Sequence, residues 1–502
     1  MRFKKYIPLL IYLLLILGCL LIVRLTGKLA EPGEPEETSS AWETVRPVPE
    51  EPSEPEDDLE RETEAESGPP VPESEPECRE ARQEWQEEAE ELPEEPYCPP
   101  TLMLASDLHY ISQNTHDDGT AFREMVARDD GKISEYSDVL LDTLVEEAIA
   151  GKPSALVLTG DITLNGEREN HRDLAEKLRR VTEAGVAVLV VPGNHDIKNG
   201  NAATYFEGAR EPAQYLEDAE DFYEIYHEFG YDQAFSRDEA SLSYFYALDD
   251  LHWMLMLDTC QYEDYNHVNG RLKPETMEWL ESGLKQAQEQ GIAVVPAGHH
   301  NLLSESRLYT TECTMENHLD IIRIFEEYRL PLYISGHLHA QRIKKHKREP
   351  GVSDGAYGIE EIVLPPYSIP PCQYGWLKWQ TDGGMAFETR KADVEAYARR
   401  QKLKDEKLLQ FGEYGQEYVK GILRNQVRTS FHAIPEDLKD EMADLYALLY
   451  YDYCAGNRMR RDEVNDSRAC RLWDRLAPDS RYVKEMNQMM EDVRQAQHDW
   501  SR

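Results

Sequence analysis

Short apolar runs alternate with helix-period segments along the chain after residue 100. Six runs of five or six residues are almost wholly apolar, namely 101–106, 155–159, 186–191, 253–257, 292–297 and 330–335. Their length and their lack of polar alternation are typical of strands that are covered on both faces. The sequence therefore predicts a buried, strand-rich core in this part of the chain.

Helical periodicity appears between these runs. One amphipathic segment ends at Gly185, and another is opened by Pro274 and closed by Gly291. Their apolar faces consist of Leu174, Leu178 and Val181 in the first segment and Met277, Leu280 and Leu284 in the second. Alternation of strands and helices predicts a layered α/β domain.

The end of the chain has a different pattern, without further apolar runs of this kind. Helical spacing recurs in two places after Asp382, one following Pro435 and one near the terminus. The residues concerned are Leu438, Met442, Leu445 and Leu449, then Tyr482, Met486, Met489 and Val493. We therefore expect four segments: an anchor at 1–30, a linker at 31–97, the α/β domain at 98–385 and a helical extension at 386–502, packed on the α/β body.

The first residues predict membrane attachment. Arg2, Lys4 and Lys5 precede a nearly unbroken apolar run from Ile7 to Val23, about the lower limit for spanning a bilayer. We interpret it as a signal anchor that makes a single pass through the cell membrane and leaves the rest of the chain outside. The alternative is a cleaved signal in which a lipobox-like sequence leads to lipidation of Cys19. Either hypothesis leaves the remaining chain tethered outside.

Charge is concentrated in the predicted linker. The chain carries a formal net charge of −43, and residues 31–97 alone contain 26 acidic and 4 basic residues. This segment is rich in Glu and Pro and too poor in apolar residues to offset its ordering entropy, which predicts an extended, disordered spacer. The acidic body also argues against binding of duplex nucleic acid.

The eight cysteines contain no CxxC pair, which argues against a zinc ribbon or a dithiol redox motif. Most are expected to be buried thiols. Outside the cell, Cys454 with Cys470 and Cys78 with Cys98 are candidate disulfides.

Five of the six apolar runs lead directly into residue types that bind metals. Because ligands of open α/β sheets lie beyond the carboxyl ends of the strands, these clusters are expected to converge on one site. Asp, Asn and His supply the oxygen and nitrogen donors suited to zinc, manganese or iron. The clusters are Asp107-Leu108-His109, Gly160-Asp161, Gly193-Asn194-His195-Asp196, Gly298-His299-His300 and Gly336-His337-Leu338-His339.

This order of motifs, over about residues 101–382, resembles the calcineurin-like metallophosphoesterase superfamily. The resemblance implies a four-layer αββα sandwich with the site at the sheet edges. The residues around these motifs further resemble an exported, membrane-anchored branch of the superfamily from Gram-positive bacteria. The segments that carry this resemblance are SDLHY, LTGDITLNGE, SLSY, MLDT, HHNLL and SGHLHAQ.

The resemblance also implies a role for each motif residue. Asp161 would bridge two divalent or trivalent ions of manganese, iron or zinc. His195 would approach the departing oxygen, with Asp196 orienting it. His300 remains an alternative to His299, because the sequence lacks the proline that often follows this histidine in the family. The implied ligands are Asp107, His109, Asp161 and His339 for one ion, and Asp161, Asn194, His299 and His337 for the other.

The function implied is hydrolysis of a phosphate monoester or diester through a metal-bridging hydroxide. The insertion 197–243 is expected either to form part of the substrate wall or to be structural. The substrate remains open among cyclic nucleotides, glycerophosphodiesters, nucleotides and cell-wall phosphates. A different dinuclear metal hydrolase and a non-catalytic surface module that keeps the fold are the alternative functions.

Overall fold

The computed structural model describes residues 97–502 except 305, 309–310 and 347–357. The predicted anchor and nearly all of the predicted linker therefore lie outside the described residues. Within the described part, no helix is long and apolar enough to cross a bilayer.

All six apolar runs form strands, as predicted. Their buried side chains on both faces explain why polar alternation is missing from the sequence. The strands are β1 (Thr101–Ala105), β2 (Ala155–Thr159), β3 (Ala187–Val191), β8 (His252–Leu257), β9 (Ala293–Gly298) and β10 (Leu332–Ser335).

The first sheet joins three of these strands to three from the end of the chain. β1, β2 and β3 are parallel neighbours, and β13 (Gln373–Trp379) pairs antiparallel with β1. β14 (Met385–Lys391) and β15 (Asp499–Ser501) extend this edge, giving the order β15-β14-β13-β1-β2-β3. The segment expected to be helical thus contains strands at both of its ends.

The second sheet is also mixed. β8, β9, β10 and β12 (Glu360–Val363) are parallel. Antiparallel strands complete the edges: β11 (Arg342–Lys345) on one side, and β7 (Tyr244–Ala247) and β6 (Ser236–Arg237) on the other. The order is β11-β12-β10-β9-β8-β7-β6.

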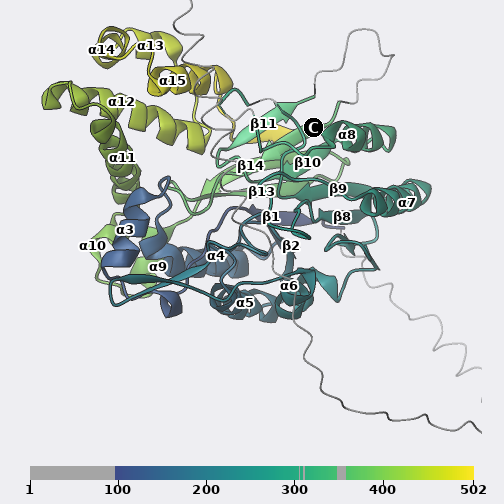
Figure 1. Cartoon of the computed structure of the whole chain (residues 1–502). Coiled ribbons are helices and arrows are strands. Elements are labelled where there is room, and N and C mark those ends of the chain that lie inside the picture. The colour runs from purple at the N-terminus through teal and green to yellow at the C-terminus, as the bar shows by residue number, and fades with distance from the viewer. Residues whose placement is uncertain (1–96, 305, 309–310, 347–357) are drawn as a thin grey trace, which may run out of the picture. The chain divides into compact units, whose positions relative to one another are not determined.

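Helices cover the outer faces of both sheets (Figure 1). The helices α4 (Ser137–Gly151) and α5 (Arg168–Glu183) pack on the first sheet, and α7 (Pro274–Gln290) and α8 (His318–Glu327) pack on the second. Successive residues of β8 show the layering: Met256 belongs to the core between the sheets, whereas Leu257 belongs to the core under α7 and α8. The predicted four-layer αββα architecture is confirmed.

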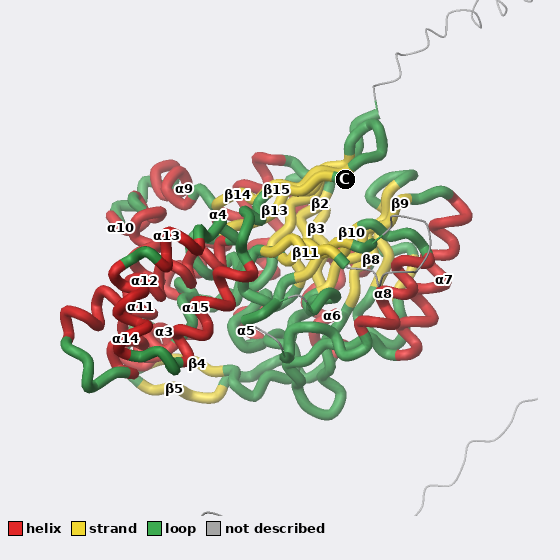
Figure 2. Tube along the Cα trace, turned by 90° about the horizontal axis from the view of Figure 1, so that it is seen from above, coloured by secondary structure: helices red, strands yellow, loops and turns green. Residues whose placement is uncertain are grey.

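The predicted helical region follows β14 and has its own apolar core. In Figure 2 its longer helices gather beside the strands. The helices are α9 (Val394–Arg400), α10 (Glu406–Leu409), α11 (Phe411–Ser430), α12 (Glu436–Ala455), α13 (Arg461–Asn465), α14 (Arg468–Leu476) and α15 (Arg481–Asp492). Two of them, α12 and α15, correspond to the helical spacings seen in the sequence.

A further small layer covers the edge of the site. α3 (Thr120–Arg128) packs against the hairpin of β4 (Ala203–Phe206) and β5 (Ala209–Pro212), with Phe122 and Tyr205 in a shared apolar cluster. The hairpin and α6 (Ala219–Tyr226) belong to the insertion after the third motif.

The candidate disulfide between Cys454 and Cys470 is absent, and Cys78 of the other candidate pair lies outside the described residues. Cys454 and Cys470 are both free, and Cys98 is a free, exposed thiol. Cys260, Cys372 and Cys454 are buried thiols, in agreement with the general expectation for this chain.

Candidate metal centre

The five motif loops meet at one edge of the two sheets. Backbone hydrogen bonds tie neighbouring loops together: Asp107 N donates to Gly160 O at 3.1 Å, and His109 N donates to Asp161 O at 2.9 Å. The loops of the second sheet are joined likewise, since Gly336 N donates to His299 O at 2.9 Å. The expected convergence of the motifs is confirmed.

The first group of side chains comprises Asp107, His109, Asp161 and His339, whose ligand atoms all lie within 4.8 Å of one another. His109 Nε2 is 3.0 Å from His339 Nε2, which is 3.4 Å from Asp107 Oδ1. Asp161 Oδ2 is 3.8 Å from His109 Nε2. This is the set that the resemblance implied for one ion.

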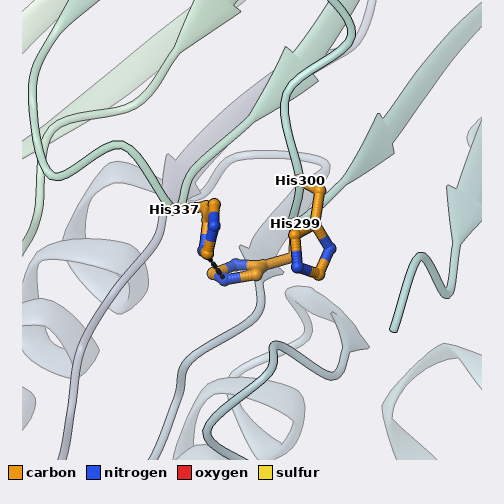
Figure 3. Close-up of side chains that lie close together, drawn as sticks. All are labelled: His299, His300 and His337. Carbon is orange, nitrogen blue, oxygen red and sulfur yellow. Dashed lines mark hydrogen bonds between the residues drawn. The ribbon is translucent and has the colours of Figure 1, made fainter. Parts of the chain in front are cut away.

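The second group centres on His299. Its Nε2 lies 3.1 Å from His337 Nδ1, 3.2 Å from Asn194 Oδ1 and 3.3 Å from Asp161 Oδ2. Figure 3 shows the contact between the His299 and His337 rings. Asp161 Oδ2 faces both groups, at 3.8 Å from His109 Nε2 and 3.3 Å from His299 Nε2.

His300 is close to the second group but is bonded elsewhere. His299, His300 and His337 have ligand atoms within 4.8 Å of one another. However, His300 Nε2 donates to Val268 O at 2.9 Å, and its Nδ1 accepts from the Thr259 hydroxyl at 2.7 Å. Both ring nitrogens are therefore already used, which favours His299 as the ligand.

The histidine tautomers fit a pair of cations. His299 Nδ1 donates to Thr159 O, and His337 Nε2 donates to Glu312 O. His339 Nδ1 lies 3.1 Å from Asp130 Oδ2, to which it donates. A carbonyl or carboxylate oxygen can only accept, so the opposite ring nitrogens direct lone pairs into the centre. Lone pairs and carboxylates facing one another at 3 Å repel unless positive charge lies between them.

The carboxylates also shift the pKa values of the histidines beside them. Burial lowers the pKa of His299, but the Asp161 charge beside it outweighs this and raises the pKa to about 9. Burial likewise opposes protonation of His339, whereas its bonds to Asp107 and Asp130 raise the pKa to about 10. Burial lowers the pKa of His337 to about 4. The two raised pKa values indicate that the site favours positive charge at His299 and His339.

The ligand loops adopt strained backbone conformations. Left-handed φ angles are uncommon for residues other than glycine and cluster at functional sites. Close packing accompanies this strain: a Cβ on Gly193 would lie 2.1 Å from Asp161 N, and one on Gly336 would lie 1.8 Å from Ser106 Oγ. The five ligands with positive φ are Asp107 (53°), His109 (42°), Asp161 (47°), His337 (66°) and His339 (51°).

His195 borders the centre without joining either group. Its Nδ1 donates to Leu164 O at 2.7 Å, and its Nε2 lies 4.0 Å from Asp161 Oδ2. The side chain is 33% exposed, so a substrate can reach it.

Asp196 does not bond the His195 ring as expected from the sequence. Its carboxylate accepts hydrogen bonds from the backbone N–H groups of Ile162, Thr163 and Gly193 and from the Thr163 hydroxyl. The Leu164 carbonyl orients the His195 ring instead, because the motif turns back on itself and buries Asp196 beneath the second and third loops. Asp196 is thus a positioning residue for these loops.

A cavity of about 760 Å³ adjoins His195. One wall comes from α3 and the loop after it, and another from the β4–β5 hairpin of the insertion. Besides His195 the lining residues are Ala121, Glu124, Met125, Arg128, Asp129, Lys132, Leu164, Asn165, Asn201, Tyr205, Gly208 and Arg210. The insertion therefore does form part of a wall beside the centre.

Asp130 is the site residue that the sequence did not reveal. It lies within the charged run Arg128-Asp129-Asp130, which has the composition of any solvated loop. Only the fold brings it to His339, so no local signal could have identified it.

Comparison with known proteins agrees with this geometry. Residues 100–341 match the family model for calcineurin-like phosphoesterases, and residues 393–495 match that for the C-terminal domain of cyclic nucleotide phosphodiesterase. No protein of curated function matches the sequence.

Solved structures show a distant likeness. A dimetal phosphatase from Danio rerio has 15% identity and a TM-score of 0.42, over 59% of this chain and 97% of its own. A purple acid phosphatase from yellow lupin (Lupinus luteus) seeds has 13% identity and a TM-score of 0.39, over 58% of this chain and 51% of its own. The family match and the αββα layers together show that residues 100–341 have the fold of the calcineurin-like metallophosphoesterases.

Proposed function

We propose that the protein is a two-metal phosphodiesterase that acts outside the cell membrane, with cyclic nucleotides as its substrate class. The observation that carries the proposal is the pair of ligand groups that share Asp161. One ion would be held by Asp107, His109, Asp161 and His339, and the other by Asp161, Asn194, His299 and His337. Bound cations supply the Lewis acidity that ionises water and offsets charge on the phosphoryl oxygens.

His195 is suited to assist departure of the leaving group. Leu164 O accepts the hydrogen on Nδ1, so Nε2 is the nitrogen that can hand a proton to a departing oxygen. The backbone bond from His195 N to Asp161 Oδ1, at 2.8 Å, fixes the ring beside the centre.

The neighbouring cavity favours a diester with a bulky organic group over a bare phosphate. Its volume of about 760 Å³ lies within the range of about 300–1,000 Å³ typical of small-molecule sites. Arg210 offers a positive charge, and Asn165 and Asn201 offer amides for hydrogen bonding. These groups suit a base and sugar carried by a phosphodiester.

The C-terminal match supports the choice of substrate class. The family model that matches residues 393–495 is described by its occurrence in cyclic nucleotide phosphodiesterase. A linked pair of domains of these two kinds makes cyclic nucleotides the first esters to test.

The experiment is a panel of phosphate esters assayed with protein that was stripped of metal and reloaded with manganese, iron or zinc. Cyclic nucleotides, glycerophosphodiesters, nucleotide monoesters and a nitrophenyl diester form the panel. The proposal expects the highest kcat/KM for a cyclic nucleotide. A clear preference for monoesters would refute the diesterase assignment, and absence of hydrolysis with every metal would refute the enzymatic one.

The proposed location rests on the apolar run from Ile7 to Val23 and the basic residues before it. Full-length protein is expected in the membrane fraction. Removal of residues 1–29 should release a soluble protein of unchanged activity, since the site is built from residues after 100. Recovery of the full-length chain in the soluble fraction would contradict membrane anchoring.

A further inference from the structure

The helical region that follows β14 packs against the loop that carries His337 and His339. Residues 336–341 alternate between two environments: His337 and His339 face the metal centre, whereas Leu338 and Ala340 are buried in the apolar core of α11, α12 and α15. We propose that the helical region 393–495 positions the metal ligands, and that Asp130 transmits this positioning to His339. The inference rests on the metal groups and is independent of which ester is hydrolysed.

Hydrogen bonds fix the 336–341 loop to the end of α12. Gln341 N donates to Cys454 O at 3.0 Å, and the Arg342 guanidinium lies 3.9 Å from the centre of the Tyr453 ring. Gly456 ends α12 so close to Gln341 that a Cβ there would lie 2.8 Å from the Gln341 side chain. The loop that carries two ligands is therefore held by contacts over its whole length.

The second connection runs through Asp130. One carboxylate oxygen accepts from His339 Nδ1 at 3.1 Å, and the other accepts from Lys132 Nζ at 2.7 Å. The Lys132 carbonyl accepts from the Tyr418 hydroxyl of α11 at 3.0 Å. The chain from α11 to the ligand thus consists of Tyr418, Lys132, Asp130 and His339.

Described residues on either side of 309–310 contact the helical region and the other ligand group. Arg307 N donates to the Asp492 carboxylate at 2.9 Å, and Cys313 packs against the helical core. Between them in sequence, close to Cys313, Glu312 O accepts from His337 Nε2 at 3.0 Å. The helical region consequently supports one histidine of each ligand group.

These contacts stabilise the conformations in which His337 and His339 face the centre. His337 and His339 have φ angles of 66° and 51°, and strained conformations persist only where the surroundings over-determine them. Groups that bond the far nitrogen of a ligating histidine fix its tautomer and direction, and their loss lowers metal affinity about 10- to 100-fold. The αββα domain alone provides neither the hydrogen bond from Tyr418 of α11 that holds the loop of Asp130 nor the apolar core that buries Leu338.

Metal binding to full-length variants tests the proposal. Asp130→Asn keeps an acceptor for His339 but removes the charge, and Asp130→Ala removes both. Equilibrium titration against a chelating indicator should show one ion bound about 10-fold more weakly in the first variant and about 100-fold more weakly in the second. The other ion should bind as in the wild type. Unchanged affinity for both ions in Asp130→Ala would overturn the proposal.

Tyr418→Phe tests the link to the helices, because it deletes only the hydroxyl that holds the Lys132 carbonyl. We expect affinity for the same ion to fall about 2- to 10-fold. Tyr482→Phe is the matched control, since its hydroxyl bonds Ser430 at 2.8 Å within the helical region. It should leave both affinities unchanged while lowering the unfolding temperature. Equal losses of affinity in both variants would show a general effect of folding and refute the link.

Metal affinity also separates this inference from the proposed function. A protein that binds two ions and hydrolyses no ester would refute the function and leave the positioning role intact. Normal metal affinity in the Asp130 variants would refute the positioning role and leave the proposed function intact.

Discussion

Asp161 holds the backbone N–H of His195 at 2.8 Å through Oδ1, while its Oδ2 faces the histidines of both ligand groups. A single carboxylate thereby connects the general-acid candidate with both ligand groups. Burial raises the pKa of Asp161, but the surrounding histidines, His299 foremost, lower it well below its usual range. The residue therefore remains charged at every pH at which the protein is expected to work.

Asp161→Asn is expected to cost more activity than any other single ligand change. Loss of the shared charge weakens both ions, so metal analysis should show both depleted and activity should fall by more than about 100-fold. Asp173→Asn is a control, because Asp173 accepts hydrogen bonds from Ser112 and Asn114 away from the centre. Full occupancy by two ions in Asp161→Asn would exclude the bridge.

His299→Ala and His300→Ala should separate two adjacent histidines. The first removes a nitrogen that points into the centre and should deplete one ion. The second breaks bonds to Thr259 and Val268, which should destabilise the fold by about 1–3 kcal/mol yet leave the metal content at two. Thermal unfolding and metal analysis of both proteins give the comparison. If His300→Ala lost an ion and His299→Ala did not, His300 would be the ligand in place of His299.

His195→Ala should retain both ions, because its ring belongs to neither ligand group. Turnover should fall about 10²- to 10⁴-fold with alkyl diesters, whose leaving oxygen needs a proton. Nitrophenyl esters should be much less affected, since their leaving group departs without one. Equal losses with both kinds of ester would indicate a donor to the phosphoryl oxygens instead.

Metal binding should release protons in a pH-dependent manner. With pKa values of about 9 and about 10, His299 and His339 are protonated in the metal-free protein at pH 7.5. His337, at about 4, is already neutral. About two protons should therefore be displaced from these histidines on full loading, in addition to any proton released by ionisation of metal-bound water. The contribution of the histidines falls as the pH rises past both pKa values, so apparent affinity increases with pH. Calorimetry in buffers of different ionisation heat counts these protons, and a count of zero at pH 7.5 would contradict the scheme.

The strands that the sequence revealed are those buried on both faces. Parallel strands such as β2 are continuous apolar runs and stand out from their surroundings. β14 was missed because Met385 and Phe387 alternate with more exposed residues in a segment dominated by helical spacing. β15 has only three residues, and its place depends on pairing with β14 more than a hundred positions earlier.

The site was predictable where ligands follow strands and unpredictable where the fold alone brings residues together. Asp107 and His339 lie beyond strand ends, so topology predicts their meeting. Asp130 contacts His339 from a charged loop, and Tyr418 bonds the Lys132 carbonyl from a separate helical region. Neither position has a local pattern. The same holds for Leu164, whose backbone carbonyl takes the place expected for Asp196.

The most direct test of the two-metal account follows activity during stepwise loading of the metal-free protein. Hydrolysis of a phosphodiester and the number of bound ions are measured together as metal is added. The account predicts little activity with the first equivalent and a rise to full activity with the second, because both ions act on one phosphoryl group across Asp161. Full activity with one bound ion, or with none, would contradict it.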